Sequence, residues 1–142
     1  MIKNFFIILI FLITGNFCFA QENFFEEAKK NFDKKNYKDS KFLFQRQIVF
    51  NPKDAKSYLY LAKIFNAEEN QSEEEKNLDT VLLLEPDNED AIYMMIKIKL
   101  KKSNFSKSKE LLDTFSAVCK SLCNKKKEIE NTLKDIEPKN ES

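Results

Sequence analysis

The stretch from Ala55 to Asn88, AKSYLYLAKIFNAEENQSEEEKNLDTVLLLEPDN, decides the fold of this chain. Its apolar spacing predicts two amphipathic helices, over Ser57–Phe65 and Ser72–Leu84, joined by a polar turn. Pro52 and Pro86 mark its borders and stand 34 residues apart. A recurrence at this period is typical of stacked helical repeats.

The same period runs through most of the chain. Phe44, Leu78 and Leu112 follow one another at intervals of 34 residues. Five further columns keep this spacing: Asn36, Asn70 and Asn104; Tyr37, Gln71 and Phe105; Ser40, Glu74 and Ser108; Phe24, Tyr58 and Ile92; Ala28, Ala62 and Ile96. Asn adopts left-handed backbone geometry more readily than most residues. We therefore expect the Asn column to occupy the left-handed position in the turn of each helix pair.

These columns resemble the tetratricopeptide repeat, a helix–turn–helix unit of 34 residues. In the middle repeat the characteristic positions of that family fall on Tyr58, Leu61, Ala62, Phe65, Leu78 and Pro86. The resemblance implies an all-α, right-handed helical solenoid with repeats over 21–54, 55–88 and 89–122.

Three positions depart from the family pattern. Ile96 stands at the position of a glycine, Lys120 at that of a proline, and Glu74 at that of a small residue. A buried carboxylate is costly, so we expect a loose turn or a rotated helix near Glu74.

A last amphipathic helix follows the third repeat. Residues 124–136, NKKKEIENTLKDI, place Ile129, Leu133 and Ile136 on one face. A solenoid needs such a helix to cover the apolar side of its last repeat. We assign a capping helix to 123–137 and a tail to 138–142.

Residues 1–20 predict a secretory signal peptide. Lys3 supplies a positive start, Phe5–Ile13 is an unbroken apolar run, and residues 18–20 have a cleavage-site pattern. The apolar run is shorter than the roughly 20 residues that span a bilayer. We expect an exported protein, periplasmic or secreted, that begins at Gln21 and has no membrane span after cleavage.

The composition excludes several classes of function. The segment 1–20 holds one of the 24 basic residues and none of the 23 acidic ones, so the remainder is neutral. A neutral chain offers no electrostatic case for nucleic acid. His is absent and the one Gly lies in the signal peptide, so histidine-activated nucleophiles and glycine-rich phosphate loops are absent too. We predict a protein that is not an enzyme and uses no cofactor or metal.

Cys119 and Cys123 are the one pair that invites a chemical interpretation. Oxidising compartments preserve disulfides, and residues four apart near a helix end fall within disulfide reach. The pair is interpreted first as a structural staple for the cap. Two free thiols, or a thiol redox or metal-handling site, are the alternatives, although C-x3-C is not the redox C-x-x-C spacing and no third ligand completes a zinc site.

The resemblance also implies a concave groove, lined by the first helices, that accepts a peptide or a partner helix. Lysines recur at one position of these helices: Lys29, Lys63 and Lys97. An apolar column lies beside them: Phe25, Leu59 and Tyr93. Together they predict a site for an acidic peptide or a chain-terminal carboxylate of a partner protein, the alternative being ordinary solvated lysines. Self-association through the N-terminal repeat is a further possibility, since Phe24, Phe25 and Phe32 lack an upstream neighbour.

Overall fold

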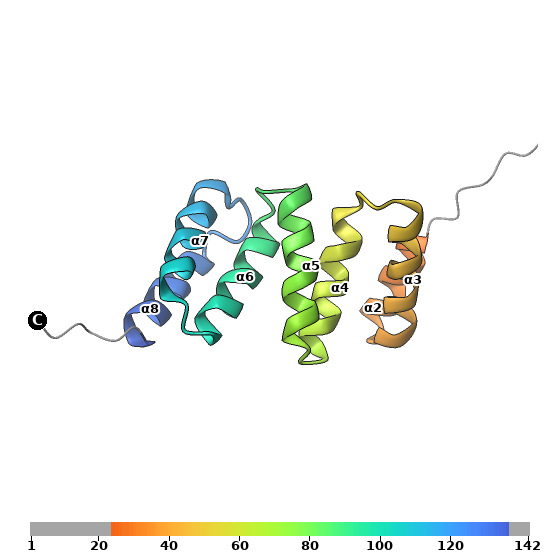
Figure 1. Cartoon of the computed structure of the whole chain (residues 1–142), viewed down its shortest axis with the longest axis horizontal. Coiled ribbons are helices and arrows are strands. Elements are labelled where there is room, and N and C mark those ends of the chain that lie inside the picture. The colour runs from red at the N-terminus through yellow and green to blue at the C-terminus, as the bar shows by residue number, and fades with distance from the viewer. Residues whose placement is uncertain (1–23, 137–142) are drawn as a thin grey trace, which may run out of the picture.

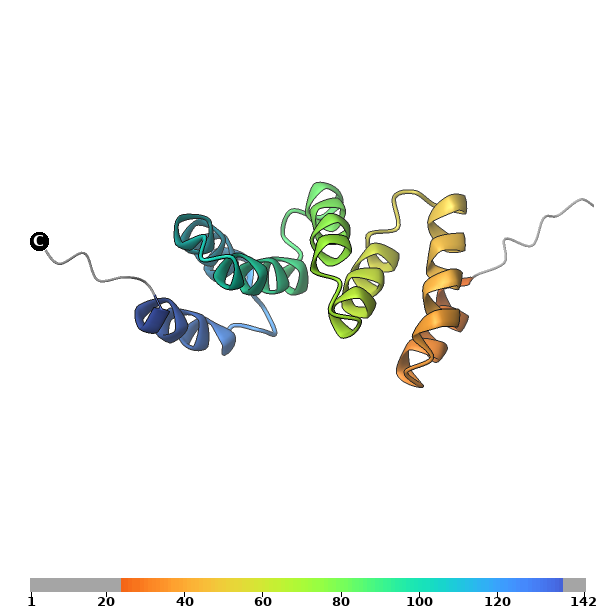
Figure 2. The same cartoon turned by 60° about the horizontal axis from the view of Figure 1, so that its bottom comes forward.

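The computed structural model describes residues 24–136 of the chain. These residues form seven helices and no strand: α2 (Phe24–Asp33), α3 (Tyr37–Phe50), α4 (Ala55–Ala67), α5 (Gln71–Leu84), α6 (Glu89–Lys101), α7 (Phe105–Val118) and α8 (Lys125–Ile136). Each helix packs on the next along the chain, and together they form one elongated row (Figures 1 and 2). The predicted all-α solenoid is confirmed. The predicted signal peptide (1–20) and tail (138–142) lie outside the described residues.

The Asn column caps the second helix of each pair. The Oδ1 atom of Asn70 accepts a hydrogen bond from the backbone N–H of Glu73 at 3.3 Å, and that of Asn104 accepts one from Lys107 at 3.1 Å. Asn36 precedes α3 at the same position without this bond. An Asn at this place satisfies an N–H that has no partner within the helix.

The left-handed residue of each turn is the one before the Asn. Lys35, Glu69 and Ser103 have φ of 60°, 56° and 53°, whereas the three Asn residues have negative φ. The prediction that Asn occupies the left-handed position was therefore wrong by one residue. The physical reason is that the N-cap needs the Asn side chain, which leaves the strained backbone position to its neighbour.

Two apolar columns spaced by 34 residues face the core. Phe44 and Leu78 are fully buried, and Leu112 is 9% exposed. The small-residue column behaves alike, because Ala28, Ala62 and also Ile96 are fully buried. Side chains at equivalent positions thus point the same way in successive repeats, as a solenoid requires.

Glu74 is buried, yet α5 is regular around it. The helix begins at Gln71 behind its Asn70 cap, and the Glu74 side chain is 3% exposed. Its Oε1 accepts a hydrogen bond from Nδ2 of Asn66 at 2.9 Å. The expected loose turn or rotated helix is not found, because an Asn from α4 satisfies the carboxylate where it lies.

The cap α8 buries Ile129 and Leu133 against the last repeat, while Ile136 remains 45% exposed. Two core clusters result, one within α2–α4 and one within α4–α8. A search for membrane spans over residues 24–136 finds no helix with the length and apolarity to cross a bilayer.

Candidate functional site

A pocket of about 160 Å³ opens between α4, α5 and α6. The first helices of the second and third repeats supply most of its wall, and Glu74 of α5 supplies the rest. Its lining residues are Lys63, Asn66, Glu74, Met94, Lys97, Ile98 and Lys101. The pocket therefore combines three ammonium groups with two apolar side chains and one carboxylate.

Two of the three predicted lysines meet in this pocket. Lys63 is half-buried and its Nζ lies 3.3 Å from Oδ1 of Asp90. Lys97 is exposed, with its Nζ 5.6 Å from the centre of the Tyr93 ring. Lys29 is also exposed but does not line the pocket. The lysine column thus splits into a pair at the pocket and a separate member on α2.

The predicted apolar column is used for packing. Leu59 is 8% exposed and belongs to the core. The ring of Phe25 packs edge-on against those of Phe44 and Tyr60, with centroids 5.6 and 5.7 Å away. Leu59 is therefore withdrawn into the core, whereas Phe25 is half-buried.

Tyr93 connects the third repeat to the cap. Its hydroxyl donates a hydrogen bond to Oε1 of Glu128 at 3.3 Å, and its ring lies 6.2 Å from that of Phe115. Burial raises the pKa of Tyr93 above its usual value. Tyr93 therefore contacts α8 through Glu128 and also packs within the third repeat.

The structure adds pocket residues that the sequence argument missed. Lys101 follows Lys97 by one helical turn, and Ile98 follows Met94 in the same way. Residues four apart share a helix face, so this spacing was available as a signal. Glu74 and Asn66 carried no such signal, since their meeting depends on how α4 packs on α5.

Solved structures resemble this chain, whereas comparisons of its sequence find no relative. No protein-family model matches the chain, and no curated protein matches it. The TPR2B domain of yeast Sti1, in a complex with pHsp70, matches with a TM-score of 0.72 and 15% identity over 80% of this chain and 95% of its own. This chain has the tetratricopeptide repeat fold.

Two further solved structures of tetratricopeptide proteins share this fold. The Yersinia enterocolitica type III secretion chaperone SycD, in complex with a peptide of the translocator YopD, gives a TM-score of 0.68 at 14% identity, over 81% of this chain and 90% of its own. The Sgt2 TPR domain from Aspergillus fumigatus gives 0.67 at 12% identity, over 82% and 78%. The resemblance seen in the sequence is confirmed at the level of fold.

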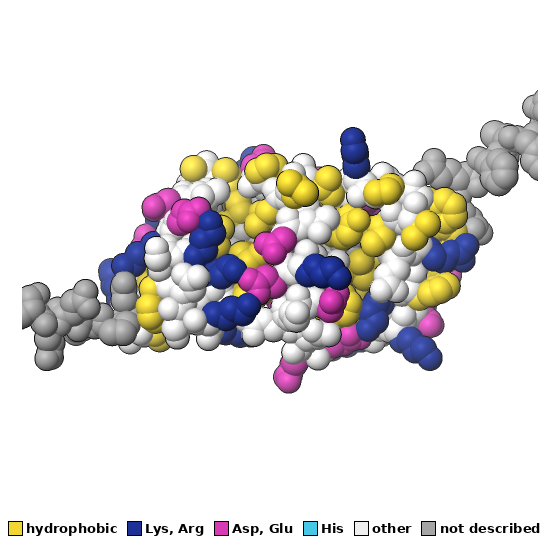
Figure 3. Space-filling view, in the orientation of Figure 1, with side chains coloured by type: hydrophobic (Ala, Val, Ile, Leu, Met, Phe, Trp, Pro, Cys, Tyr) yellow, Lys and Arg dark blue, Asp and Glu magenta, His cyan; other side chains and the backbone are white. Residues whose placement is uncertain are grey.

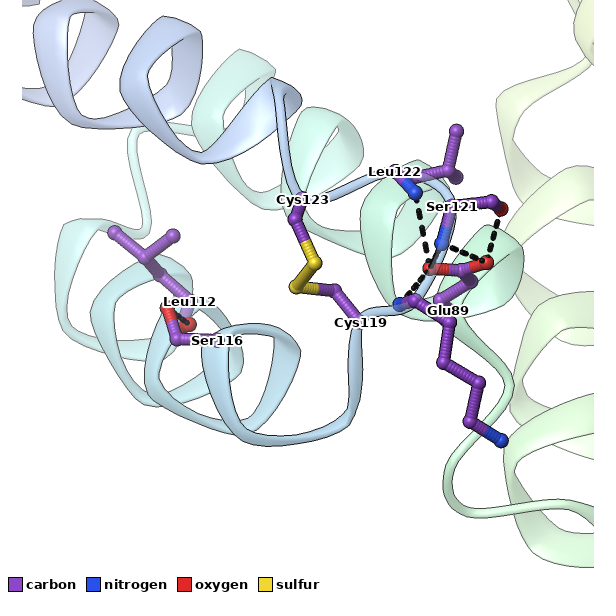
Figure 4. The surroundings of a disulfide bond; sticks show 8 residues. Glu89, Leu112, Ser116, Cys119, Ser121, Leu122 and Cys123 are labelled. Carbon is purple, nitrogen blue, oxygen red and sulfur yellow. Dashed lines mark hydrogen bonds between the residues drawn. A yellow bond between two sulfur atoms is a disulfide. The ribbon is translucent and has the colours of Figure 1, made fainter.

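The third tetratricopeptide repeat ends in a cross-linked loop (Figure 4). Cys119 and Cys123 form a disulfide, with S–S at 2.11 Å and Cα atoms 5.3 Å apart. Cys119 is half-buried and Cys123 is exposed. Over residues 24–136, no group of three or more His, Cys, Asp or Glu side chains is placed to hold a metal ion.

Glu89 binds this loop from the start of α6. Its carboxylate accepts backbone N–H bonds from Lys120 at 2.7 Å and from Ser121 and Leu122 at 3.1 Å, and it also accepts the Ser121 hydroxyl (Figure 4). These donors favour the charged form and lower the pKa of Glu89 to about 2. We refer to Glu89 and residues 119–123 as the Glu89 clasp.

Proposed function

We propose that this protein is a non-catalytic interaction module that binds an acidic segment of a partner protein at the Lys63–Lys97–Lys101 pocket. The observation that carries the proposal is the convergence of these three lysines, from two successive first helices, on one pocket with apolar walls. A carboxylate ligand suits ammonium donors, and the apolar walls suit the side chain next to it. Solved structures of the same fold include a complex with a peptide.

The charges around the pocket favour an anionic ligand. Of the nearby carboxylates, Glu74 is held by Asn66 and Asp90 is paired with Lys63. Lys97 and Lys101 lie one turn apart on α6 and are both exposed. Glu128 also feels the charge of Lys97 but is paired with Lys125. The carboxylate of an arriving ligand would therefore meet the ammonium groups of Lys97 and Lys101, which form no salt bridge among residues 24–136, and this favours its association.

Peptide titration tests this proposal. We expect a fluorescent acidic peptide with a free C-terminal carboxylate to bind the full chain, and the double variant Lys97→Glu with Lys101→Glu to bind it at least about tenfold more weakly. The matched control is Lys127→Glu with Lys134→Glu, which makes the same charge change on exposed positions of α8. Fluorescence anisotropy at low and high salt measures both.

Two outcomes would contradict the proposal that the peptide binds at this pocket. Equal binding by the two double variants would mean that overall charge, and not this pocket, attracts the peptide. Binding that is unchanged when the peptide's acidic residues are replaced by amides would show that the pocket does not recognise a carboxylate.

We also propose that the chain is exported, that residues 1–20 are removed, and that the disulfide staples the cap. The support is the signal-peptide pattern of residues 1–20 together with the Cys119–Cys123 bond, since disulfides persist in oxidising compartments. The intact mass of protein recovered from an exporting host should match a chain that starts at Gln21 and has no free thiol. A chain that retains Met1, or that reacts with thiol reagents while folded, would overturn these assignments.

A further inference from the structure

The outer face of α3 carries large apolar side chains in water. Phe42 is 58% exposed, Val49 74% and Phe50 62%. We call these three residues the α3 patch. Figure 3 shows hydrophobic side chains gathered over the end of the row where α3 lies. Contiguous exposed apolar side chains on a small protein mark an interaction surface more often than chance.

The α3 patch is organised around a buried ring. The ring of Phe50 stacks on that of Phe24 with centroids 5.7 Å apart. The guanidinium carbon of Arg46 lies 4.1 Å from the centre of the Phe24 ring and 5.9 Å from that of Phe42. The Arg46 guanidinium thus lies over the Phe24 and Phe42 rings, as a cation packed on aromatic side chains does. The α3 patch therefore consists of exposed apolar side chains with one guanidinium packed on their aromatic neighbours.

The two ends of the solenoid differ in cover. At the C-terminal end, α8 packs Ile129 and Leu133 onto the last repeat. At the other end, α2 and α3 close the row in both views, and no described helix lies beyond them (Figures 1 and 2). Phe24, Phe25 and Phe32, which we expected to be exposed there, are covered instead: Phe24 is buried, and Phe25 and Phe32 are half-buried against Tyr60 of α4. The surface that needs a cover is therefore the α3 patch.

We propose that a second copy of this chain covers the α3 patch, with the two α3 helices packed antiparallel across a twofold axis near Arg46. In that arrangement Phe42 of each copy meets Phe50 of the other. Asp39, in the first turn of α3, then lies opposite Lys53, in the turn after the helix, and both are exposed. The Asp39 and Lys53 positions are thus complementary in charge across the axis, as a twofold interface requires. Each Arg46 guanidinium stays over the Phe24 ring of its own copy.

The length of chain upstream of α2 favours a second copy over an internal cover. If residues 1–20 are removed, only Gln21, Glu22 and Asn23 precede α2, too few to form a helix over the α3 patch. The choice of a second copy rests on the proposed removal of residues 1–20, but the α3 patch is a different surface from the lysine pocket and does not rest on that site.

Sedimentation over a wide range of protein concentrations tests the dimer. We expect the chain, purified after any processing by the expression host, to shift from monomer to dimer as its concentration rises. Phe42→Ser with Val49→Ser should raise the dissociation constant at least about tenfold, while Lys97→Glu with Lys101→Glu should leave it unchanged. Circular dichroism shows that each variant is folded.

Charge reversal tests the antiparallel arrangement. Asp39→Lys and Lys53→Asp should each weaken the dimer, since each places like charges opposite one another twice, and the double variant should restore it. Lys127→Asp and Asp135→Lys, on exposed positions of α8, are the controls and should change nothing. Failure of the double variant to recover would overturn the arrangement.

Three other results would overturn the dimer itself. The first is a monomer at every concentration. The second is a monomer that binds vesicles of mixed anionic and zwitterionic phospholipid through the α3 patch, which would make the partner a membrane. The third is a chain that retains residues 1–20, stays monomeric and holds that segment over the α3 patch, which would make the segment the cover.

Discussion

Replacing Phe44 with alanine is expected to lower the free energy of unfolding by about 3–5 kcal/mol. Phe44 is fully buried between α2, α3 and α4. Its ring stacks on Tyr60 with centroids 5.0 Å apart and meets Phe25 edge-on at 5.6 Å. The truncation leaves a cavity and removes these ring contacts, so the cost exceeds the transfer of a phenyl group alone. Urea denaturation followed by circular dichroism measures it.

A buried and an exposed leucine provide a matched pair of substitutions that tests the same core. Leu112, at the equivalent position of the third repeat, is 9% exposed, whereas Leu83 is 81% exposed. Leu112→Ala should cost about 2–5 kcal/mol and Leu83→Ala within about 0.5 kcal/mol of nothing. Similar losses for the two leucines would mean that the columns spaced by 34 residues do not form the core.

Acid is expected to weaken the Glu89 clasp. The pKa of Glu89 is lowered from 4.5 to about 2 by the Ser121 hydroxyl and by the N–H groups of the loop. A carboxyl with a depressed pKa in the folded state stabilises fully above its unfolded value. That contribution is therefore complete above about pH 4.5 and is lost as the pH falls toward about 2.

Comparing the chain with Glu89→Gln isolates this effect. Glu75 and Glu128 also have lowered pKa values, so both proteins lose stability in acid. The unvaried chain should lose more between about pH 5 and pH 2, because only it still carries the carboxylate of the clasp. Parallel curves of unfolding free energy against pH would show that the clasp does not contribute.

The sequence predicted the helix pairs because burial repeats with the helix-pair period. Phe44, Leu78 and Leu112 are spaced alike and buried alike. That logic covers residues whose role depends on position within one repeat. It failed for the Asn column, since both a left-handed turn and an N-cap favour Asn and the two positions are adjacent.

Other features depend on contacts that no local pattern encodes. Glu89 finds its partners more than thirty residues away, and most of them are backbone N–H groups, which every residue type supplies. Leu59 carries the spacing of a groove residue but is drawn into the core. The sequence did not predict the exposure of the α3 patch, because an apolar residue in a helix is expected to be buried. Only the packing of the neighbouring helices shows which face remains outside.

Among the described helices, α4 is the one that contributes to both core clusters. Leu61, Ile64 and Phe65 point into the cluster with α2 and α3, while Leu59 and Ala62 point into the cluster with the helices that follow. In a row where each unit packs mainly on its neighbours, α4 is therefore the helix whose side chains join the two halves of the core. We therefore expect a disturbance at α3 to reach Lys97 and Lys101 chiefly through the side chains of α4.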